Sequence, residues 1–247
     1  MVEIKNLSKS FNHNRNRVLD QLNLSIFDGE ILSIIGESGV GKSVFVKCLI
    51  GLIKPDSGQI FIDGEEITDL SEEELNKRIR IKMGMVYQYG ALWDSLTVGE
   101  NIKLGLKFKR HLPESEMDKI TDEILELVGL PEVKNKYPDE LSGGMNKRIS
   151  IARAIVMKPK YLIYDEPTTG LDPVLINIID DLIVKLNKEH KITSLVISHN
   201  IHSAETISDR VCMLYQGKII HLCDADKIWK QDNKIFNQFI HGDVKFQ

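Results

Sequence analysis

Short apolar runs near the start of this 247-residue chain predict β-strands. Apolar and polar residues alternate over Val2–Ile4 and again over Leu22–Ile26, a pattern typical of half-buried strands. The run Ile31–Ile35 is apolar at nearly every position and stops at Gly36. Such a run favours a strand buried within a parallel sheet.

The same patterns return in the second half of the chain. Tyr161–Asp165 and Thr193–Ser198 are short apolar runs, and each predicts a further strand. Val211–Tyr215 and Lys218–Leu222 flank the pair Gln216-Gly217. Two strand-like runs around such a pair predict a β-hairpin.

Helical spacing separates these strand-like runs. Ser43–Ile53 predicts a mostly buried helix, and Pro113–Val128 and Ser142–Met157 predict two more. Ser71 and Glu74 have the spacing of a capping box, which predicts a charged helix after them. Because strands alternate with helices, the predicted fold class is α/β with a largely parallel central sheet.

Residues 88–157 show the apolar spacing of helices, whereas the segments before and after them contain strand-like runs. We expect a helical subdomain inserted into the sheet domain there.

Composition and charge limit the possible functions. Apolar residues make up 42% of the chain and charged residues 28%, with 32 basic and 36 acidic side chains and a net charge of −4. These values are ordinary for a globular protein and give no strong field that would attract nucleic acid or anionic lipid. Cys48, Cys212 and Cys223 lack metal-type spacing, and we expect reduced core residues. The chain has neither a recognisable signal peptide nor an apolar run that could span a bilayer, so we expect any membrane role to depend on a partner.

A glycine-rich segment directly after Ile31–Ile35 matches the phosphate-binding pattern G-x-x-x-x-G-K-S. It consists of Gly36, Glu37, Ser38, Gly39, Val40, Gly41, Lys42 and Ser43. Its glycines let backbone N–H groups turn toward phosphate oxygens, and the following helix adds partial positive charge. We expect Lys42 to reach the β- and γ-phosphates and the Ser43 hydroxyl to bind Mg²⁺. The alternative, a glycine-rich turn with an exposed lysine, is disfavoured by the flanking strand and helix.

Two carboxylates follow one of the predicted strands. Asp165 closes the run that begins at Tyr161, and Glu166 comes next. Ligands bind beside the carboxyl ends of strands in such sheets, so Asp165 could enter the shell of a Mg²⁺ ion and Glu166 could act as general base toward water. The pair alone would equally fit a solvated acidic turn, and the phosphate-binding loop upstream favours the functional interpretation.

Three further residues are candidates on position alone. His199 follows the run Thr193–Ser198 and could contact a γ-phosphate, although a lone histidine there is more often a turn residue. Gln88 follows an apolar run and could join the Mg²⁺ shell or sense the γ-phosphate. Phe11 could stack on a base, or could belong to the core.

A second anion site is predicted at the start of the helix that follows Leu141. Ser142 is a good N-cap, and Gly143 and Gly144 leave their backbone amides unhindered. The alternative is a plain cap with flexible glycines. A chain with a complete phosphate-binding loop and a second, separate anion site favours an arrangement in which two copies share each nucleotide.

Taken together, these motifs resemble those of the ATP-binding subunits of ABC transporters, over nearly the whole chain. By resemblance, Gly36–Ser43 corresponds to the Walker A loop and Leu141–Met145 to the signature. The single positions that correspond are Phe11 (adenine stacking), Gln88 (Q-loop), Asp165 and Glu166 (Walker B), Asp172 (D-loop) and His199 (switch histidine).

The resemblance implies a P-loop NTPase core with a mostly parallel sheet, an N-terminal antiparallel β subdomain and an inserted helical subdomain. The implied division is 1–87 and 158–225 for the core, 88–157 for the helical subdomain and 226–247 for a C-terminal tail. It also implies a head-to-tail homodimer that hydrolyses ATP with Mg²⁺. Membrane permease subunits would dock near residues 88–98, at the cytoplasmic face of the inner membrane.

Finer features are similar to the Mla-type lipid-transport ATPases of this family. These features are the segment Gln88–Val98, Met145 within the signature, and Phe239–Gly242. They imply phospholipid transport between inner and outer membranes, with an Mce-domain substrate-binding protein and a STAS-like subunit as partners. Trp93 and Asn200 depart from the pattern, where phenylalanine and aspartate are usual.

Other functions remain open. Oligopeptide importers share Ser-Gly-Gly-Met, so an ATPase of a peptide or amino-acid importer is the alternative. Soluble ABC ATPases of genome maintenance or translation carry a long insertion or a second cassette, and neither occurs here. A nucleotide-sensing scaffold without turnover is disfavoured because both Glu166 and His199 are present.

Overall fold

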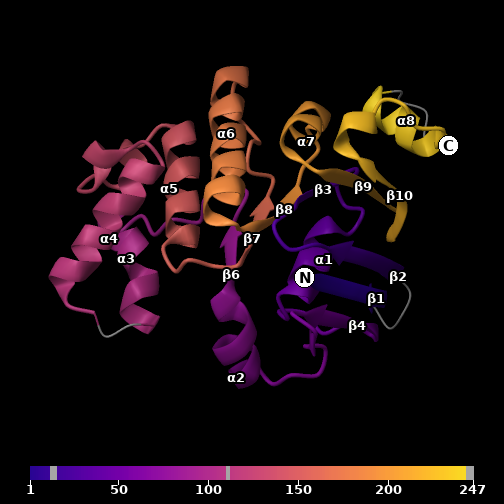
Figure 1. Ribbon diagram of the computed structural model, residues 1–247, viewed down its shortest axis with the longest axis horizontal. Helices are drawn as coiled ribbons and strands as arrows, with labels where there is room; N and C mark the ends of the chain where they lie inside the picture. Colours follow the sequence, from indigo (N-terminus) through magenta and orange to yellow (C-terminus); the bar gives the residue numbers. More distant parts are fainter. Residues whose placement is uncertain (12–15, 110–111, 243–247) are drawn as a thin grey trace.

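In the computed structural model, the chain forms two β-sheets with helices packed around them (Figure 1). The structure describes residues 1–11, 16–109 and 112–242. The larger sheet has the strand order β10-β9-β3-β8-β7-β6. Its strands are β3 (Ile31–Ile35), β6 (Met83–Val86), β7 (Tyr161–Asp165), β8 (Thr193–Ile197), β9 (Arg210–Tyr215) and β10 (Lys218–Asp224). Neighbouring strands are parallel except for the hairpin of β9 and β10, which confirms the predicted α/β class and the hairpin around Gln216-Gly217.

The smaller sheet is antiparallel and contains the start of the chain. Its order is β2-β1-β4-β5. Its strands are β1 (Val2–Phe11), β2 (Asn16–Ile26), β4 (Ser57–Ile62) and β5 (Glu65–Glu66). Val2 lies opposite Ile26 on one side and Ile62 on the other. These buried side chains pack with Phe45 into the core that joins the smaller sheet to the helix after β3. The predicted alternating strands and the N-terminal antiparallel sheet are thereby confirmed.

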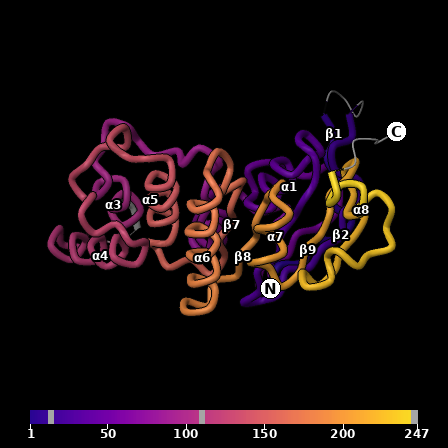
Figure 2. The backbone as a smooth tube through the Cα atoms, turned by 90° about the horizontal axis from the view of Figure 1, so that it is seen from above, coloured from indigo at the N-terminus to yellow at the C-terminus, as the bar shows by residue number. Residues whose placement is uncertain are grey.

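Three α-helices take up much of the described chain between β6 and β7. They are α3 (Val98–Lys109), α4 (Glu114–Leu127) and α5 (Gly143–Ile155). They lie together at one end of the molecule, on the left in Figure 1 and again in the view of Figure 2. Ile102, Leu125 and Ile149 are fully buried among them and join a core that continues to Tyr164 of β7. The predicted helical insertion is confirmed.

The helix of the phosphate-binding loop is shorter than predicted. Helix α1 spans Lys42–Leu49, so the expectation of a helix to Ile53 is wrong. Gly51 adopts φ +70°, and the N–H group of Leu52 donates to the carbonyl oxygen of Lys47 at 2.8 Å. A left-handed glycine of this kind ends an α-helix. The apolar spacing continues beyond this stop, which is why the pattern overestimates the helix.

The capping box at Ser71 is present in the structure. The Ser71 hydroxyl accepts from the N–H group of Glu74, and the Glu74 carboxylate accepts from the Ser71 N–H group at 3.0 Å. The helix that begins there, α2 (Glu72–Glu74), continues as a π-helical turn over Leu75–Ile79. The charged helix is therefore confirmed at its start, but it changes type after one turn.

Three helices after β7 are not among the elements that the pattern predicts. They are α6 (Pro173–His190), α7 (Ile201–Ile207) and α8 (Lys234–Ile240). Helices α7 and α8 border a third core, in which Ile35, Met213 and Phe236 are buried. Most of the segment expected to be a C-terminal tail is therefore folded against the larger sheet.

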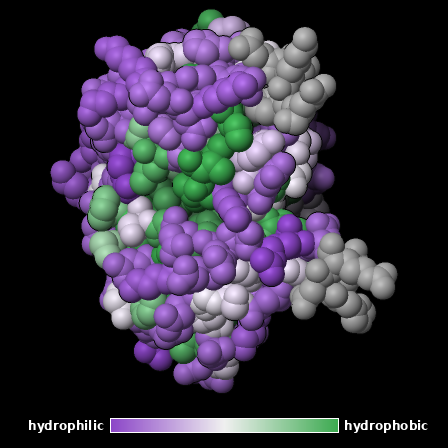
Figure 3. All heavy atoms as spheres, turned by 90° about the vertical axis from the view of Figure 1, so that its right-hand side faces the viewer, coloured by the Kyte–Doolittle hydropathy of each residue, from purple (hydrophilic) through white to green (hydrophobic). Residues whose placement is uncertain are grey.

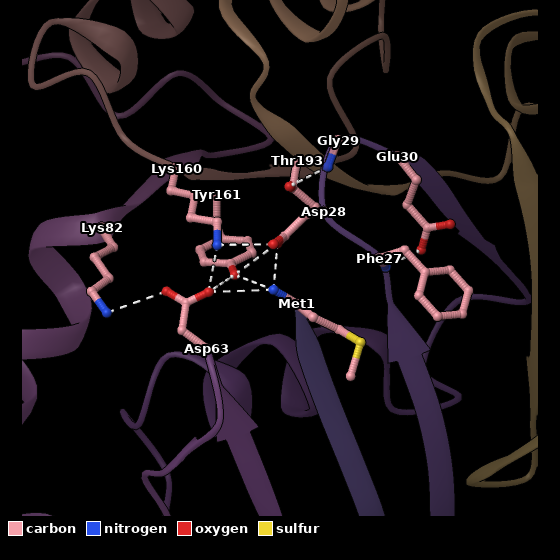
Figure 4. A network of polar contacts seen from close by, with 10 residues as sticks. All are labelled: Met1, Phe27, Asp28, Gly29, Glu30, Asp63, Lys82, Lys160, Tyr161 and Thr193. Carbon is pink, nitrogen blue, oxygen red and sulfur yellow. Dashed lines mark hydrogen bonds and ion pairs between the residues drawn. The ribbon is translucent and has the colours of Figure 1, made fainter.

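A network of charges joins the edges of the two sheets (Figure 4). The amino group of Met1 forms an ion pair with Asp28 and another with Asp63 at 3.3 Å. Lys160 contacts both carboxylates, and the Tyr161 hydroxyl donates to Asp63 at 2.5 Å. Partial burial alone would raise the pKa of Asp63, but these hydrogen bonds outweigh it and the pKa is well below the usual range. The network therefore holds β1, the turn after β4 and the start of β7 together.

The surface at the α8 end of the molecule carries a recess where hydrophobic side chains gather within a largely hydrophilic face (Figure 3). Leu222 of β10 and Trp229 are among the large apolar residues exposed in this part of the chain. Among the described residues, no helix has both the length and the apolar character needed to cross a membrane.

Candidate active site

A pocket of about 500 Å³ opens where β3, β7 and β8 end. Its walls are formed by Phe11, Val18, Ser38, Gly39, Gly41, Lys42, Ser43, Val44, Gln88, Asp165, Glu166 and His199. The carboxyl ends of parallel strands share one sheet edge, so residues far apart in sequence meet there. Most of the predicted site residues therefore lie in one place, and Val18 and Val44 are additions that no motif indicated.

Lys42 lies at the base of this pocket. Its ammonium group donates to the carbonyl oxygens of Gly36 at 2.6 Å and Glu37 at 2.9 Å. The residue is only 8% exposed, so the alternative of a turn with an exposed lysine does not hold. Burial lowers the pKa of Lys42, and the nearby charges of Glu166 and Asp165 oppose this effect. The loop thus holds a desolvated positive charge where phosphates would enter.

The glycines of the loop are required by close packing as well as by conformation. Gly36 has φ +153°, and a Cβ there would overlap the carbonyl oxygen of Leu214. Gly41 is the N-cap of α1 with φ +109°, and its Cβ would lie 2.8 Å from the carbonyl oxygen of Val18. The loop can therefore adopt this shape only with glycine at both positions.

Glu166 and His199 meet at the mouth of the pocket. Glu166 Oε2 lies 2.6 Å from His199 Nδ1 and also accepts from the Thr169 hydroxyl at 3.2 Å. The side chain of Glu166 is 13% exposed, whereas that of His199 is 60% exposed. Neighbouring Asp165 is also partly buried, and burial followed by the charge of Glu166 raises its pKa. A shielded carboxylate beside an accessible imidazole can accept a proton from water, so the pair suits general-base chemistry.

Gln88 enters the pocket from the loop after β6. Its carbonyl oxygen accepts a hydrogen bond from Lys147 of α5, and Lys147 also donates to the carbonyl oxygen of Glu166 at 3.3 Å. Neither Lys147 nor Thr169 was indicated by a motif. Their roles follow from contacts between segments far apart in sequence, for which the residue pattern carries no signal.

The predicted second anion site lies elsewhere. Ser142 caps α5 by accepting from the N–H group of Met145, and Gly143 is exposed beside it. Gly144 is buried, and a Cβ there would lie 2.8 Å from the side chain of Leu175 at the start of α6. Asp172 caps α6, with its carboxylate accepting two backbone N–H groups. None of these four predicted residues lines the pocket of Lys42, so the signature and D-loop positions gather at a separate place on the same chain.

The side chains around the pocket suit a nucleoside triphosphate with Mg²⁺. Ser43, Gln88 and Asp165 contribute hydroxyl, amide and carboxylate oxygens to its walls. Mg²⁺ binds such oxygen ligands and completes its shell with waters and substrate phosphates. The loop amides and Lys42 provide the complementary positive groups for the phosphates.

The sequence matches a known protein family over most of its length. The family model described as "ABC transporter" matches residues 19–169, more than half of the chain. The chain belongs to the ABC transporter family and is an ATP-binding cassette of it, an ATPase that uses ATP with Mg²⁺.

Individual relatives match this chain over nearly its whole length. The chain is 38% identical over 98% of its length to "Probable ribonucleotide transport ATP-binding protein mkl" of Mycobacterium leprae, and covers 69% of that protein. It is 39% identical over 98% of its length to "Methionine import ATP-binding protein MetN" of Haemophilus ducreyi, and covers 71% of it. The chain thus spans roughly two thirds of the length of these relatives.

A solved structure shares the fold closely. It is the dimeric structure of a post-hydrolysis state of the ATP-binding cassette MJ0796 bound to ADP and Pi. The TM-score is 0.84 at 35% identity, with 91% of this chain and 99% of that chain covered.

Proposed function

We propose that this chain dimerises head to tail around two ATP molecules, and that ATP binding and hydrolysis drive the transport of phospholipid between inner and outer membranes. The observation that carries the dimer is the separation of Ser142–Gly144 from the pocket of Lys42. Each helix start would complete the pocket of the partner copy. The dimeric cassette with 35% identity supports this arrangement.

Within each site, the residues take the following roles. Phe11 stacks on the base, and the P-loop with Lys42 binds the phosphates. Ser43, Gln88 and Asp165 hold Mg²⁺, which supplies charge neutralisation at the β- and γ-phosphates when bound. Glu166 accepts a proton from the attacking water and His199 keeps that carboxylate oriented. This division is supported by the 2.6 Å contact between the two side chains.

The proposed docking region for a permease includes 88–98. Tyr89 is 85% exposed and Trp93 is 62% exposed, which is unusual for side chains of this size. A groove of about 590 Å³ reaches Tyr87, immediately before this segment, and is lined mainly by β6 and the turn before it, with Gly105 of α3 and Arg153 of α5. Exposed aromatic residues beside a groove fit an inserted helix of a membrane subunit. Such docking would place the chain at the cytoplasmic face of the inner membrane.

The proposal of phospholipid as the transported molecule rests on the likeness of Gln88–Val98, Met145 and Phe239–Gly242 to the Mla-type ATPases. It includes an Mce-domain binding protein and a STAS-like subunit as partners. The relatives differ in the substrates that their names give, ribonucleotide in one and methionine in another. The methionine relative favours an amino-acid or peptide importer as the second candidate.

The composition of the native complex distinguishes these candidates. The complex is purified in detergent from its own membrane, and its subunits and lipids are identified by mass spectrometry. We expect a permease, an Mce-domain protein and enriched phospholipid. A peptide- or amino-acid-binding lipoprotein in their place would overturn the lipid proposal and leave the ATPase assignment intact.

A further inference from the structure

Lys147 is buried between two residues of the active site without lining the pocket itself. It is 7% exposed, and its ammonium group donates to the carbonyl oxygens of Gln88 and Glu166. Burial lowers the pKa of Lys147, while Glu166 and Asp165 oppose this effect. Burying an ammonium group costs free energy unless it is hydrogen-bonded. The two carbonyl oxygens therefore fix where the Lys147 ammonium group lies.

The loop that carries Gln88 is fastened to the same helix at a second point. Arg153 donates to the carbonyl oxygens of Gly90 at 3.1 Å and Ala91 at 2.6 Å. Gly90 packs against Asn146 and Ser150, where a Cβ would find no room. Positions 146, 150 and 153 recur at helical spacing and so form one face of α5. The loop and α5 are therefore held as one unit.

Glu166 has a main-chain conformation that needs support. Its φ is +52°, in the left-handed region that non-glycine residues rarely occupy. Its N–H group donates to the carbonyl oxygen of Ile197 at 2.9 Å, and its carbonyl oxygen accepts from Lys147 at 3.3 Å. Hydrogen bonds on both sides hold the peptide groups in this conformation, and the direction of the carboxylate toward His199 depends on it.

We propose that Lys147 is a positioning residue that fixes the main chain of Glu166 relative to Gln88 and to the signature end of α5. It acts through Glu166, so the inference rests on the proposed role of Glu166 as general base. The hydrogen bonds of Lys42 within the P-loop do not involve Lys147. Loss of Lys147 should therefore slow hydrolysis while ATP affinity stays nearly unchanged.

The test compares Lys147→Met with a matched control in the purified full-length chain. Lys103→Met removes another lysine that is equally buried, 8% exposed, but is paired with Glu114 and Asp118 away from the pocket. Turnover is measured per ATP-binding site, and the ATP dissociation constant is measured separately. We expect kcat to fall about tenfold to a hundredfold in Lys147→Met, with the dissociation constant changed less than about threefold. The control should keep the wild-type kcat per site.

A conservative variant and a double variant make the result decisive. Lys147→Arg keeps the positive charge and the hydrogen-bond donors, so its kcat should lie close to that of the wild type. Lys147→Gln replaces Lys147→Met if the methionine variant does not fold. In a Glu166→Gln background, Lys147→Met should add little further loss, because both act on one step. An unchanged kcat in both Lys147→Met and Lys147→Gln, or an equal loss in Lys103→Met, would overturn the inference. Normal turnover of Glu166→Gln alone would instead overturn the proposed base.

Discussion

Glu166 Oε2 lies 2.6 Å from His199 Nδ1, although 33 positions separate the two residues in the chain. Glu166 follows β7 and His199 follows β8, and these strands are parallel neighbours in the larger sheet. The contact is thus a direct result of sheet topology. It joins a shielded carboxylate to an exposed imidazole at the mouth of the pocket.

The carboxylate of Glu166 is expected to be the group that accepts the proton from water. Glu166→Gln keeps the shape of the side chain and removes its basicity, so turnover should fall by about 10²–10⁴. ATP binding should persist, and the ATP-bound dimer should accumulate in size-exclusion chromatography. Glu73→Gln, on the exposed surface of α2, serves as the control and should behave as wild type. Turnover of Glu166→Gln close to that of the wild type would remove the residue from this role.

His199 is expected to matter for its contact with Glu166 and not for stability. His199→Ala leaves the carboxylate without its 2.6 Å partner, and kcat should fall about tenfold or more. His202 is a matched control, because it is 86% exposed on the neighbouring helix α7 and contacts no pocket residue. His202→Ala should keep full turnover, and the two variants should unfold at similar temperatures. Equal activities of both variants would contradict the assignment.

Gly36 is expected to tolerate no side chain. Gly36→Ala combines a strained φ with overlap onto the carbonyl of Leu214, so the free energy of unfolding should fall by about 2–4 kcal/mol. Gly64 also has a positive φ, +79°, but a Cβ added there would have no atom within 4 Å. Gly64→Ala therefore isolates the strain and should cost about 1 kcal/mol. Urea denaturation of both variants measures the difference, and equal losses would show that the overlap relaxes freely.

The Asp63 network is expected to stabilise the fold in a pH-dependent way. The pKa of Asp63 lies below its ordinary value of 3.8, so its stabilisation is fully present above that value and is lost as pH falls through the lower folded value. Asp63→Asn should lower the free energy of unfolding by about 1–3 kcal/mol at neutral pH. The gap to the wild type should shrink below about pH 4. Urea denaturation between pH 3 and 8 checks this.

An exposed ion pair provides the comparison for Asp63. Asp69 pairs with Lys54, and both side chains are at least 70% exposed. Asp69→Asn should change stability little at any pH, because surface pairs contribute little. A gap between wild type and Asp63→Asn that stays constant down to pH 3 would contradict the role of the network.

Many residues of the pocket can be predicted from the sequence because they lie at the carboxyl ends of predicted strands. The P-loop and His199 come directly after apolar runs, and Asp165 closes such a run. Parallel pairing brings these positions to one edge of the sheet. The α/β class follows from the same runs. These features depend on local pattern and on general rules of sheet topology.

The remaining features depend on contacts that leave no local pattern. Lys147 reaches carbonyl groups of two distant segments, and nothing in its helix marks it apart from other lysines. From the sequence, Gly144 predicts only an unhindered backbone N–H group. In the structure, its lack of a side chain also leaves room for Leu175. The end of α1 at Leu49 depends on the conformation of Gly51, which apolar spacing does not register.

In the proposed dimer, each ATP site is shared by two copies, since Ser142–Gly144 lie outside the pocket of their own chain. Lys42→Ala disables the P-loop, and Ser142→Arg blocks the opposite half. Each variant alone should form no intact site, whereas a mixed dimer contains exactly one such site by symmetry.

Nucleotide binding and turnover of the mixture test this most directly. After the two inactive variants are mixed in equal amounts and allowed to exchange, we expect one tightly held ATP per mixed dimer and about a quarter of the wild-type number of sites. If the mixture binds and turns over no more than the average of the two separate variants, each pocket belongs to a single chain and the shared-site account is wrong.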